Sequence, residues 1–335
     1  MRQTSLRRRA LALVGIAAAS ALALTGCSGS ASNDSGSGSD SAAKSVKIGI
    51  SQLVQHPALD AATKGFKKAL EDSGMKVTFD EQNAQGEQSN AVTIAQKFAS
   101  SDADLYLAVA TPAAQALAQA VTNKPVLFTA VTDAVTTQLV KSNEQPGGNV
   151  TGTSDAAPID KQLELLKQIV PGAKTVGIVY SSAEANSEVQ VKAAEEAGKK
   201  QGLSFKTKTV TTANDIAQAT ESLGDVDAIY VPTDNTVVSG LAALVQVAEK
   251  KQIPVIGAEA GTVEKGAVAT LGIDYEKLGY QTGEMAVQIL KDGKKPADLP
   301  VETAKDVNYV VNEGAAKRMG VTIPADILDK AEKVK

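Results

Sequence analysis

The chain of 335 residues is poor in the side chains that most enzymes and metal sites use. It has one His, one Cys and no Trp, and aromatic residues make up 3% of it. It contains no Gly-x-Ser-x-Gly elbow, no Walker-type phosphate loop and no Gly-x-Gly-x-x-Gly after the first predicted strand. No cluster of His and Cys could hold zinc. We therefore expect no catalytic residues, no metal and no cofactor, although a mechanism that uses only carboxylates stays open because Asp and Glu are plentiful.

The charge of the chain excludes a second class of protein. Lys and Arg number 34 against 38 Asp and Glu, which gives a formal net charge of −4, and the Lys residues are scattered along the chain. This pattern lacks the basic stripe of a nucleic-acid-binding protein, so we expect no nucleic-acid partner. The low aromatic content also disfavours a carbohydrate ligand, because sugar rings usually stack on aromatic side chains.

The N-terminal segment has the pattern of a bacterial lipoprotein signal. Three Arg residues at positions 7 to 9 precede an apolar run, residues 10–23, that is too short to span a bilayer comfortably. The run ends in Leu24-Thr25-Gly26-Cys27, which resembles a lipobox, where the Cys is lipidated with palmitate and becomes the mature N-terminus. Lipidation also accounts for a Cys without an intrachain partner, and the alternative is a free thiol in a cleaved signal. We assign 1–26 to a lipoprotein signal peptide and 27–45, rich in Ser, Gly, Asp and Asn, to the lipidated Cys and a flexible tether.

From residue 46 onward, short apolar strands alternate with longer helical segments, which predicts an α/β fold with parallel sheets. About 290 residues are too many for one such sheet and favour two domains. The two halves also resemble each other, because three strand motifs recur in order at a nearly constant offset. These motifs match Gly49 with Gly177, Tyr106 with Tyr230, and Pro125 with Pro254.

We therefore predict two similar doubly wound parallel-sheet domains, joined by a hinge that the chain crosses three times, near Thr153, Asp274 and Glu302. The N-terminal lobe would contain 46–153 and 275–302, and the C-terminal lobe would contain 154–274 and 303–335. Ligands bind at the carboxyl ends of the strands in such sheets, so two facing domains would hold a ligand in the cleft between them. Several crossings are typical of receptors that close around a ligand.

One βα turn is the strongest candidate for contact with an anion. An apolar strand over 105–109 is followed by Thr111 and Pro112. Thr suits the N-cap position of a helix, and Pro suits its first turn. The free N–H groups of this helix would point past the carboxyl edge of the sheet, where they can bind an anion. The alternative is an ordinary capped turn with no ligand.

Several motifs together resemble those of a group of ABC-transporter substrate-binding lipoproteins, which includes tryptophan- and tyrosine-binding members. Gln55 and Ala134 depart from the pattern of the group, since Glu often precedes its His-Pro and Pro often follows its Thr-Asp. The resemblance covers nearly all of the mature chain. The motifs are His56-Pro57-Ala58-Leu59-Asp60, Thr111-Pro112-Ala113-Ala114-Gln115, Phe128-Thr129-Ala130-Val131-Thr132-Asp133, Gly147-Gly148-Asn149-Val150-Thr151-Gly152, Glu184-Ala185-Asn186-Ser187, Pro232-Thr233-Asp234-Asn235-Thr236, Gly272-Ile273-Asp274-Tyr275 and Leu278-Gly279.

The resemblance implies a type I periplasmic-binding-protein fold and a small solute, with an aromatic amino acid favoured. It implies delivery of the solute to an ABC permease and its ATPase. The expected protein is a monomer on the outer face of the cytoplasmic membrane, attached through its lipid anchor only. Two alternatives stay open: the same receptor fold with a nucleoside or sugar ligand, and a surface sensor or adhesin without transport. A transcription regulator of this shape would need a helix-turn-helix before residue 46, where the signal peptide stands.

The candidate ligand-binding residues follow from this expectation. Thr111, the N–H groups of Ala113 and Ala114, and Thr132 would bind a carboxylate, and Asp234 would bind an ammonium group from the other lobe. Capping of a helix is the alternative for Asp234, and it is an equal alternative for Asp133. His56 is most often a turn residue, and whether it contacts ligand is left open. The full predicted set is Gln52, Gln55, Thr111, Ala113, Ala114, Thr132, Asp133, Asn186, Ser187, Asp234, Asn235, Glu259 and Asp274.

Overall fold

The chain forms two sheets in which most neighbouring strands are parallel. The computed structural model describes residues 45–305 and 307–334. The predicted signal peptide, Cys27 and the tether up to residue 44 therefore lie outside the described residues. Among the helices of the described ranges, none combines the length and the apolar character needed to cross a membrane.

The first sheet has the strand order β11-β5-β4-β3-β1-β2, and every pair in it is parallel. Its central strands β3 and β4 are buried throughout. β3, the strand predicted over 105–109, has no charged or hydroxyl-bearing aliphatic residue, which is typical of a strand covered on both faces. The edge strand β2 alternates between exposed and half-buried residues instead. The strands are β1 (Val46–Gln52), β2 (Val77–Asn83), β3 (Leu105–Val109), β4 (Val126–Val131), β5 (Val150–Ser154) and β11 (Glu302–Thr303).

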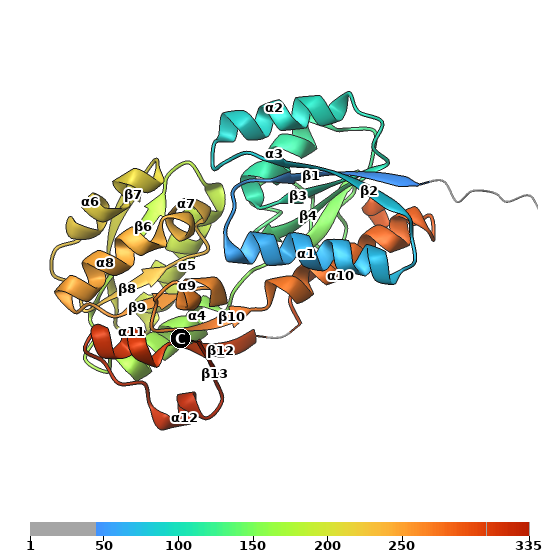
Figure 1. The fold of residues 1–335 in the computed structure, drawn as a ribbon. Helices are drawn as coiled ribbons and strands as arrows, with labels where there is room; N and C mark the ends of the chain where they lie inside the picture. The colour runs from blue at the N-terminus through green and yellow to red at the C-terminus, as the bar shows by residue number, and fades with distance from the viewer. Residues whose placement is uncertain (1–44, 306, 335) are drawn as a thin grey trace, which may run out of the picture. The chain divides into compact units, whose positions relative to one another are not determined.

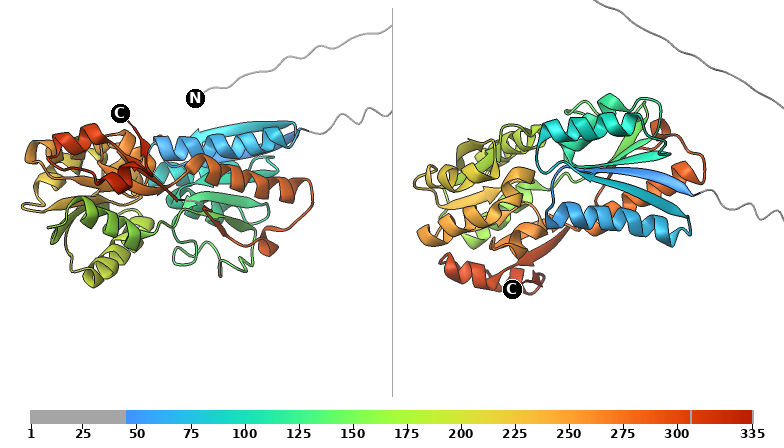
Figure 2. Two further views of the ribbon diagram at one scale, coloured as in Figure 1. Left: turned by 90° about the horizontal axis from the view of Figure 1, so that it is seen from below. Right: turned by 45° about the horizontal axis from the view of Figure 1, so that its top comes forward.

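Two helices cover each face of the first sheet. α1 (Pro57–Asp72) lies beside α10 (Tyr275–Leu290) on one face, and α2 (Gln88–Ala99) lies beside α3 (Thr111–Ala120) on the other (Figures 1 and 2). α1 and α10 are distant in sequence but approach closely because glycines stand at their interface. A Cβ added at Gly279 would lie 1.9 Å from the carbonyl oxygen of Ala62, and one at Gly65 would lie 1.9 Å from that of Glu276.

The second sheet has the order β13-β12-β10-β9-β8-β6-β7 and is parallel except where β12 pairs with β10. α4 and α5 lie on one face, and α6 and α8 on the other (Figure 1). Its strands are β6 (Thr175–Ser181), β7 (Ser204–Val210), β8 (Ala228–Val231), β9 (Val255–Gly257), β10 (Ala269–Ile273), β12 (Val307–Val311) and β13 (Glu332–Lys333). The helices near it are α4 (Ile159–Ile169), α5 (Ala185–Lys200), α6 (Ile216–Glu221), α7 (Asn235–Ser239), α8 (Leu241–Lys251), α9 (Ala260–Glu264), α11 (Glu313–Arg318) and α12 (Ala325–Leu328).

The chain passes between the two sheets three times. It leaves the first sheet after β5, builds β6 to β10 of the second, and returns with α10 and β11 before ending in β12 and β13. We call the first sheet with α1, α2, α3 and α10 the first lobe, and the second sheet with its helices the second lobe. The α/β architecture with two doubly wound, mainly parallel sheets is the one the sequence predicted.

Several elements differ from the sequence prediction. The apolar pattern of the sequence predicts one helix over 238–250, whereas the structure divides this region at Gly240 into α7 and α8. A Cβ at Gly240 would lie 2.7 Å from Ile216 Cδ1, so close packing on α6 places the break there. β10, β11, β13 and α9 were not predicted, because each is five residues or shorter and carries little periodic signal.

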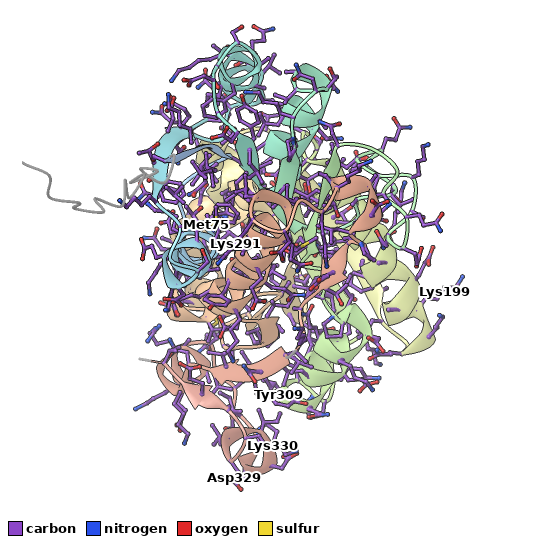
Figure 3. The ribbon with its side chains drawn as sticks, turned by 90° about the vertical axis from the view of Figure 1, so that its right-hand side faces the viewer. Met75, Lys199, Lys291, Tyr309, Asp329 and Lys330 are labelled. Carbon is purple, nitrogen blue, oxygen red and sulfur yellow. The ribbon has the colours of Figure 1, made fainter. Side chains whose placement is uncertain are left out.

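Many charged side chains of the described residues lie at the outside of the molecule. Lys199, Asp329 and Lys330 are exposed and point away from the ribbon (Figure 3). Ion pairs between the described residues also use partly or largely exposed side chains, such as Lys64 with Glu276 at 2.8 Å. Such pairs contribute about 0–1 kcal/mol each, so the two apolar cores dominate the stability.

We predict that Gly279→Ala lowers the free energy of unfolding by about 1–3 kcal/mol, because the added methyl group forces α1 and α10 apart. Gly172→Ala is the matched control, since its added Cβ would have no atom within 4 Å. Chemical denaturation of both variants measures the effect. Equal stability of the two variants would show that the contact between the helices is not close in solution.

Candidate functional site

The polar residues that matter most lie at the carboxyl edges of the two sheets. In a parallel sheet all strands end at the same edge, so residues that follow different strands gather there. In the first lobe these are Ser51 in β1, Thr111 after β3, Thr132 after β4 and Asp155 after β5. The corresponding residues of the second lobe follow β6, β8 and β9.

The start of α3 presents unpaired donors. Ala114 N donates to Ala110 O at 3.0 Å, which leaves the N–H groups of Thr111 and Ala113 without a partner inside the helix. Thr111 Oγ1 and Ser51 Oγ are buried and have no hydrogen-bond partner among the described residues. Ser51 pairs with Ala108 of the neighbouring strand β3, three residues before Thr111, so both hydroxyls lie at the same carboxyl edge as the two N–H groups. Such a set suits a carboxylate.

The structure corrects the predicted capping of this helix. Ala110, not Thr111, is the N-cap residue, with φ +82° and ψ +154°. This backbone region is occupied almost only by Gly, so the turn is strained, and strained residues cluster at functional sites. The correction also removes Ala114 from the carboxylate donors, since its N–H is used inside the helix. Ser51 takes its place as a residue that sequence reasoning missed.

A group of buried acids lies where the lobes join. Asp155 Oδ1 accepts from Thr132 Oγ1 at 3.0 Å, and Oδ2 accepts from the hydroxyl of Tyr275 at 2.7 Å. Glu259, at the carboxyl end of β9, is buried, and its Oε1 has no partner among the described residues. Burial raises the pKa of Asp155, and burial together with the nearby Asp155 raises the pKa of Glu259 to about 8. A site with this excess of buried carboxyl groups favours a cationic ligand group.

Asp234 has a different role from the one first assigned to it. Its Oδ1 accepts from Val237 N at 2.8 Å as the N-cap of α7, and its Oδ2 accepts from Ser181 N at 2.5 Å. The capping alternative therefore describes what its carboxyl group does in the structure. Burial and the charge of Glu184 raise the pKa of Asp234 to about 7. Whether Asp234 also contacts ligand stays a prediction.

Glu184 organises the residues next to Asp234. Its carboxylate accepts from Asn235 N at 3.1 Å, Asn235 Nδ2 at 2.5 Å, Thr236 N at 2.9 Å and Thr236 Oγ1 at 2.8 Å. Asn186 donates to Thr233 O at 3.1 Å, while its Oδ1 is buried without a partner among the described residues. These hydrogen bonds therefore fix residues 233–236, which follow β8, against the start of α5.

The two edges contact each other directly. Gln190 Nε2 of α5 donates to Thr132 Oγ1 of the first lobe at 3.1 Å, and Thr233 Oγ1 lies 3.5 Å from the same oxygen. His56 Nε2, at the start of α1, lies 3.2 Å from Asn235 Oδ1. A cavity of about 180 Å³ lies at the same boundary, and residues of both lobes line it, among them Gly86 and Asn235.

The remaining predicted residues divide into four kinds. Gln52 is buried, donates to Asp60 Oδ1 at 2.7 Å and accepts from Thr63, so its amide is used inside the first lobe. Gln55 is exposed. Asp133 accepts from Val135 N and Thr136 N, and Asp274 accepts from Lys277 N, so both carboxylates cap the chain that follows them. Ser187 is fully buried beside Asn186 in α5.

Sequence reasoning missed five residues of this region. Ser51 and Asp155 stand at the ends of predicted strands, so the rule that polar residues gather at carboxyl edges could have found them. Glu184 precedes the predicted Asn186-Ser187 pair by two residues. Gln190 lies inside α5, where no local signal distinguishes it from a solvent-facing residue. Tyr275 is the first residue of α10 and directly follows the predicted Asp274.

We predict that Asp234→Ala lowers the free energy of unfolding of the ligand-free protein by about 2–4 kcal/mol, because two buried N–H groups lose their acceptor. Asp227→Ala is the matched control. Asp227 also accepts from two backbone N–H groups, each at 2.8 Å, but it is exposed, so water can replace it. Urea denaturation compares the two. Wild-type stability of Asp234→Ala would contradict the capping role.

Comparisons with protein families and with known proteins relate this chain to solute-binding proteins. Residues 47–335 match the family described as ABC transporter substrate binding protein. The chain is 47% identical over 281 residues to the tyrosine-binding protein of Clostridioides difficile (strain R20291). This match covers 82% of this chain and 81% of that protein.

Two solved structures extend the comparison. The ABC domain from Streptococcus pneumonia in complex with L-Trp is 40% identical, with a TM-score of 0.84 over 87% of this chain and 100% of that one. A ligand-free, open substrate-binding protein with adhesive properties from Clostridium difficile is 49% identical, with a TM-score of 0.66 over the same shares. The type I periplasmic-binding-protein fold expected from the sequence is confirmed, and the chain belongs to the family of ABC-transporter substrate-binding proteins.

Proposed function

We propose that this binding protein holds a free amino acid, with an aromatic side chain favoured, between its two lobes and delivers it to an ABC permease and its ATPase. The observation that carries the proposal is that one part of the site suits an anionic group and another part suits a cationic group. Within the described part of the chain, the first lobe presents donors without a partner at Ser51 and Thr111, and Oε1 of Glu259 in the second lobe is an acceptor without a partner. An α-amino acid combines an anionic and a cationic group on one carbon atom.

The carboxylate of the ligand would lie at the start of α3. Ser51 Oγ, Thr111 Oγ1 and the N–H groups of Thr111 and Ala113 supply donors, and the helix dipole adds a favourable field. Buried donors without an acceptor are unfavourable by about 1–3 kcal/mol each, so a carboxylate there gains free energy beyond its own hydrogen bonds.

The ammonium group would face Glu259 and Asp155 instead of Asp234. Both carboxylate oxygens of Asp234 already accept from backbone N–H groups, whereas Glu259 Oε1 has no partner among the described residues. A cation beside Glu259 stabilises its ionised form and lowers its raised pKa.

Closing of the lobes around the ligand is supported by the structural comparison. The ligand-free, open relative is more identical in sequence than the L-Trp complex, 49% against 40%, yet its TM-score is lower, 0.66 against 0.84. Sequence identity alone predicts the reverse order. We infer that the arrangement described above corresponds to the closed, ligand-bound form.

Two other functions have less support. Sugar-binding proteins among the structural neighbours, such as a glucose-galactose binding protein at 20% identity, share the fold and do not bear on the ligand. Adhesion is favoured by one relative whose description names adhesive properties. It is compatible with solute binding, because it would use the outer surface and not the cleft. We propose no enzymatic activity.

For ligand chemistry we expect Thr111→Val and Glu259→Gln each to weaken L-tyrosine or L-tryptophan binding by ~30-fold or more, since breaking a buried charged contact is unfavourable by about 2–5 kcal/mol. Thr93→Val and Glu264→Gln are exposed controls on α2 and α9. Calorimetry measures the affinities. Because the chain has no Trp, indole emission from a purified complex also reports bound tryptophan directly.

Two results would contradict parts of this proposal. Heat with a nucleoside or a sugar, and none with Tyr, Trp, Phe, Leu or Val, would make the amino-acid ligand wrong. Wild-type affinity of Glu259→Gln would make only the ammonium assignment wrong.

We further propose that Cys27 carries the lipid that holds the mature, monomeric protein on the outer face of the cytoplasmic membrane. The lipobox and the absence of a second Cys support this. Cys27→Ser should abolish metabolic labelling with palmitate and leave the protein as uncleaved precursor or shed into the medium. Normal processing and membrane retention without label would disprove the anchor.

A further inference from the structure

The single His of the chain lies between the lobes. His56 is 4% exposed, and its Nε2 is 3.2 Å from Asn235 Oδ1 at the start of α7. The next residue, Pro57, also faces the second lobe, because a Cβ added at Gly261 of α9 would lie 3.4 Å from Pro57 Cβ. The beginning of α1 is therefore part of the contact between the two lobes.

The partners of Asn235 determine which nitrogen of His56 carries a proton. Glu184 accepts from Asn235 Nδ2 at 2.5 Å, and it also accepts from the backbone N–H groups of Asn235 and Thr236. The side-chain NH₂ group thus points to Glu184, and the carbonyl oxygen Oδ1 faces His56. Since Oδ1 can only accept, Nε2 of His56 must be the donor.

The surroundings of Nδ1, the other ring nitrogen of His56, favour the neutral form of the imidazole. Nδ1 is buried and has no partner among the described residues, so a protonated ring would bury an N–H without an acceptor. Lys265 after α9 opposes a second positive charge, and the attraction of Asp60 on α1 is the smaller effect. Glu184 reaches the ring only through Asn235. Burial lowers the pKa of His56 to about 4.

We propose that His56 is a positioning residue for closing: as a neutral imidazole that donates from Nε2, it joins α1 to α7 in the ligand-bound form, and protonation of its ring opposes ligand binding. The inference rests on the proposed closing around an amino acid. The pKa of an exposed His is about 6.5, and that of the closed form is lower. Closing is therefore unaffected above about pH 6.5 and becomes less favourable as pH falls toward 4.

Calorimetry with L-tyrosine and L-tryptophan at pH 7.5 and pH 5 tests the proposal. From the two pKa values we expect the dissociation constant of the wild type to rise roughly tenfold or more between pH 7.5 and pH 5. His56→Gln keeps a donor near the position of Nε2 but does not titrate, so its affinity should change much less. His56→Ala loses the bridge and should bind more weakly at both pH values. Glu259, Asp155 and Asp234 titrate in every variant, so the difference between wild type and His56→Gln isolates the ring.

The imidazole signals provide a second readout, because His56 is the only His. In protein saturated with L-tyrosine or L-tryptophan, nitrogen NMR should show the Nε2–H form with a titration midpoint below pH 5. Without ligand the midpoint should lie near its ordinary value. An Nδ1–H form, an unchanged midpoint, or equal pH profiles of wild type and His56→Gln would overturn the proposal. If the wild type binds neither amino acid at either pH, the proposed function fails, and this inference fails with it.

Discussion

Parallel pairing of the strands is the constraint on which the site depends. Every strand of the first sheet ends at one edge, and β6 to β10 of the second sheet do the same. Helix starts and polar loops are thereby brought to two edges without any need for them to be close in sequence. The three passages of the chain between the sheets then connect these edges, and hydrogen bonds such as Gln190 to Thr132 show that they meet.

The polar groups at these edges are of two kinds, which differ in whether they have hydrogen-bond partners. Some are fully paired and rigid: Asp234 and Glu184 accept from backbone N–H groups, so they hold the second lobe's edge in shape. Others, namely Ser51 Oγ, Thr111 Oγ1 and Glu259 Oε1, are buried and have no hydrogen-bond partner in residues 45–305 and 307–334. An unpaired buried group lowers stability by about 1–3 kcal/mol, so a protein retains several only where something else compensates. This difference separates the framework of the site from its contact surface.

The sequence predicted the parts that depend on local rules. The strand over 105–109 and the helix that follows it were correct, and so was the likeness of the two halves, whose sheets share one strand order. The N-cap was wrong: Ala110 occupies that position with a positive φ, and an Ala side chain gives no sign of such a backbone in the sequence. The N–H of Ala110 donates to Thr129 O in the sheet, a contact that no local rule predicts. Asp234 and Glu259 both follow strands and look equivalent in sequence. Only the fold shows that two backbone N–H groups donate to Asp234, whereas Oε1 of Glu259 has no hydrogen-bond partner among the residues that the structure describes.

Contacts between the lobes were beyond any local rule. His56 and Asn235 are 179 positions apart, and neither carries a sequence signal for the other. Yet the contact of His56 with Asn235 and the burial of Glu259 depend on pH in opposite directions. The raised pKa of Glu259 means that its burial becomes more favourable as pH falls below about 8, whereas burial of His56 becomes less favourable as pH falls below its ordinary value. Near neutral pH, then, the neutral ring of His56 permits closing, while the ionised carboxylate of Glu259 resists burial. A cationic ligand group removes that resistance, so closing at neutral pH is coupled to the charge of the ligand.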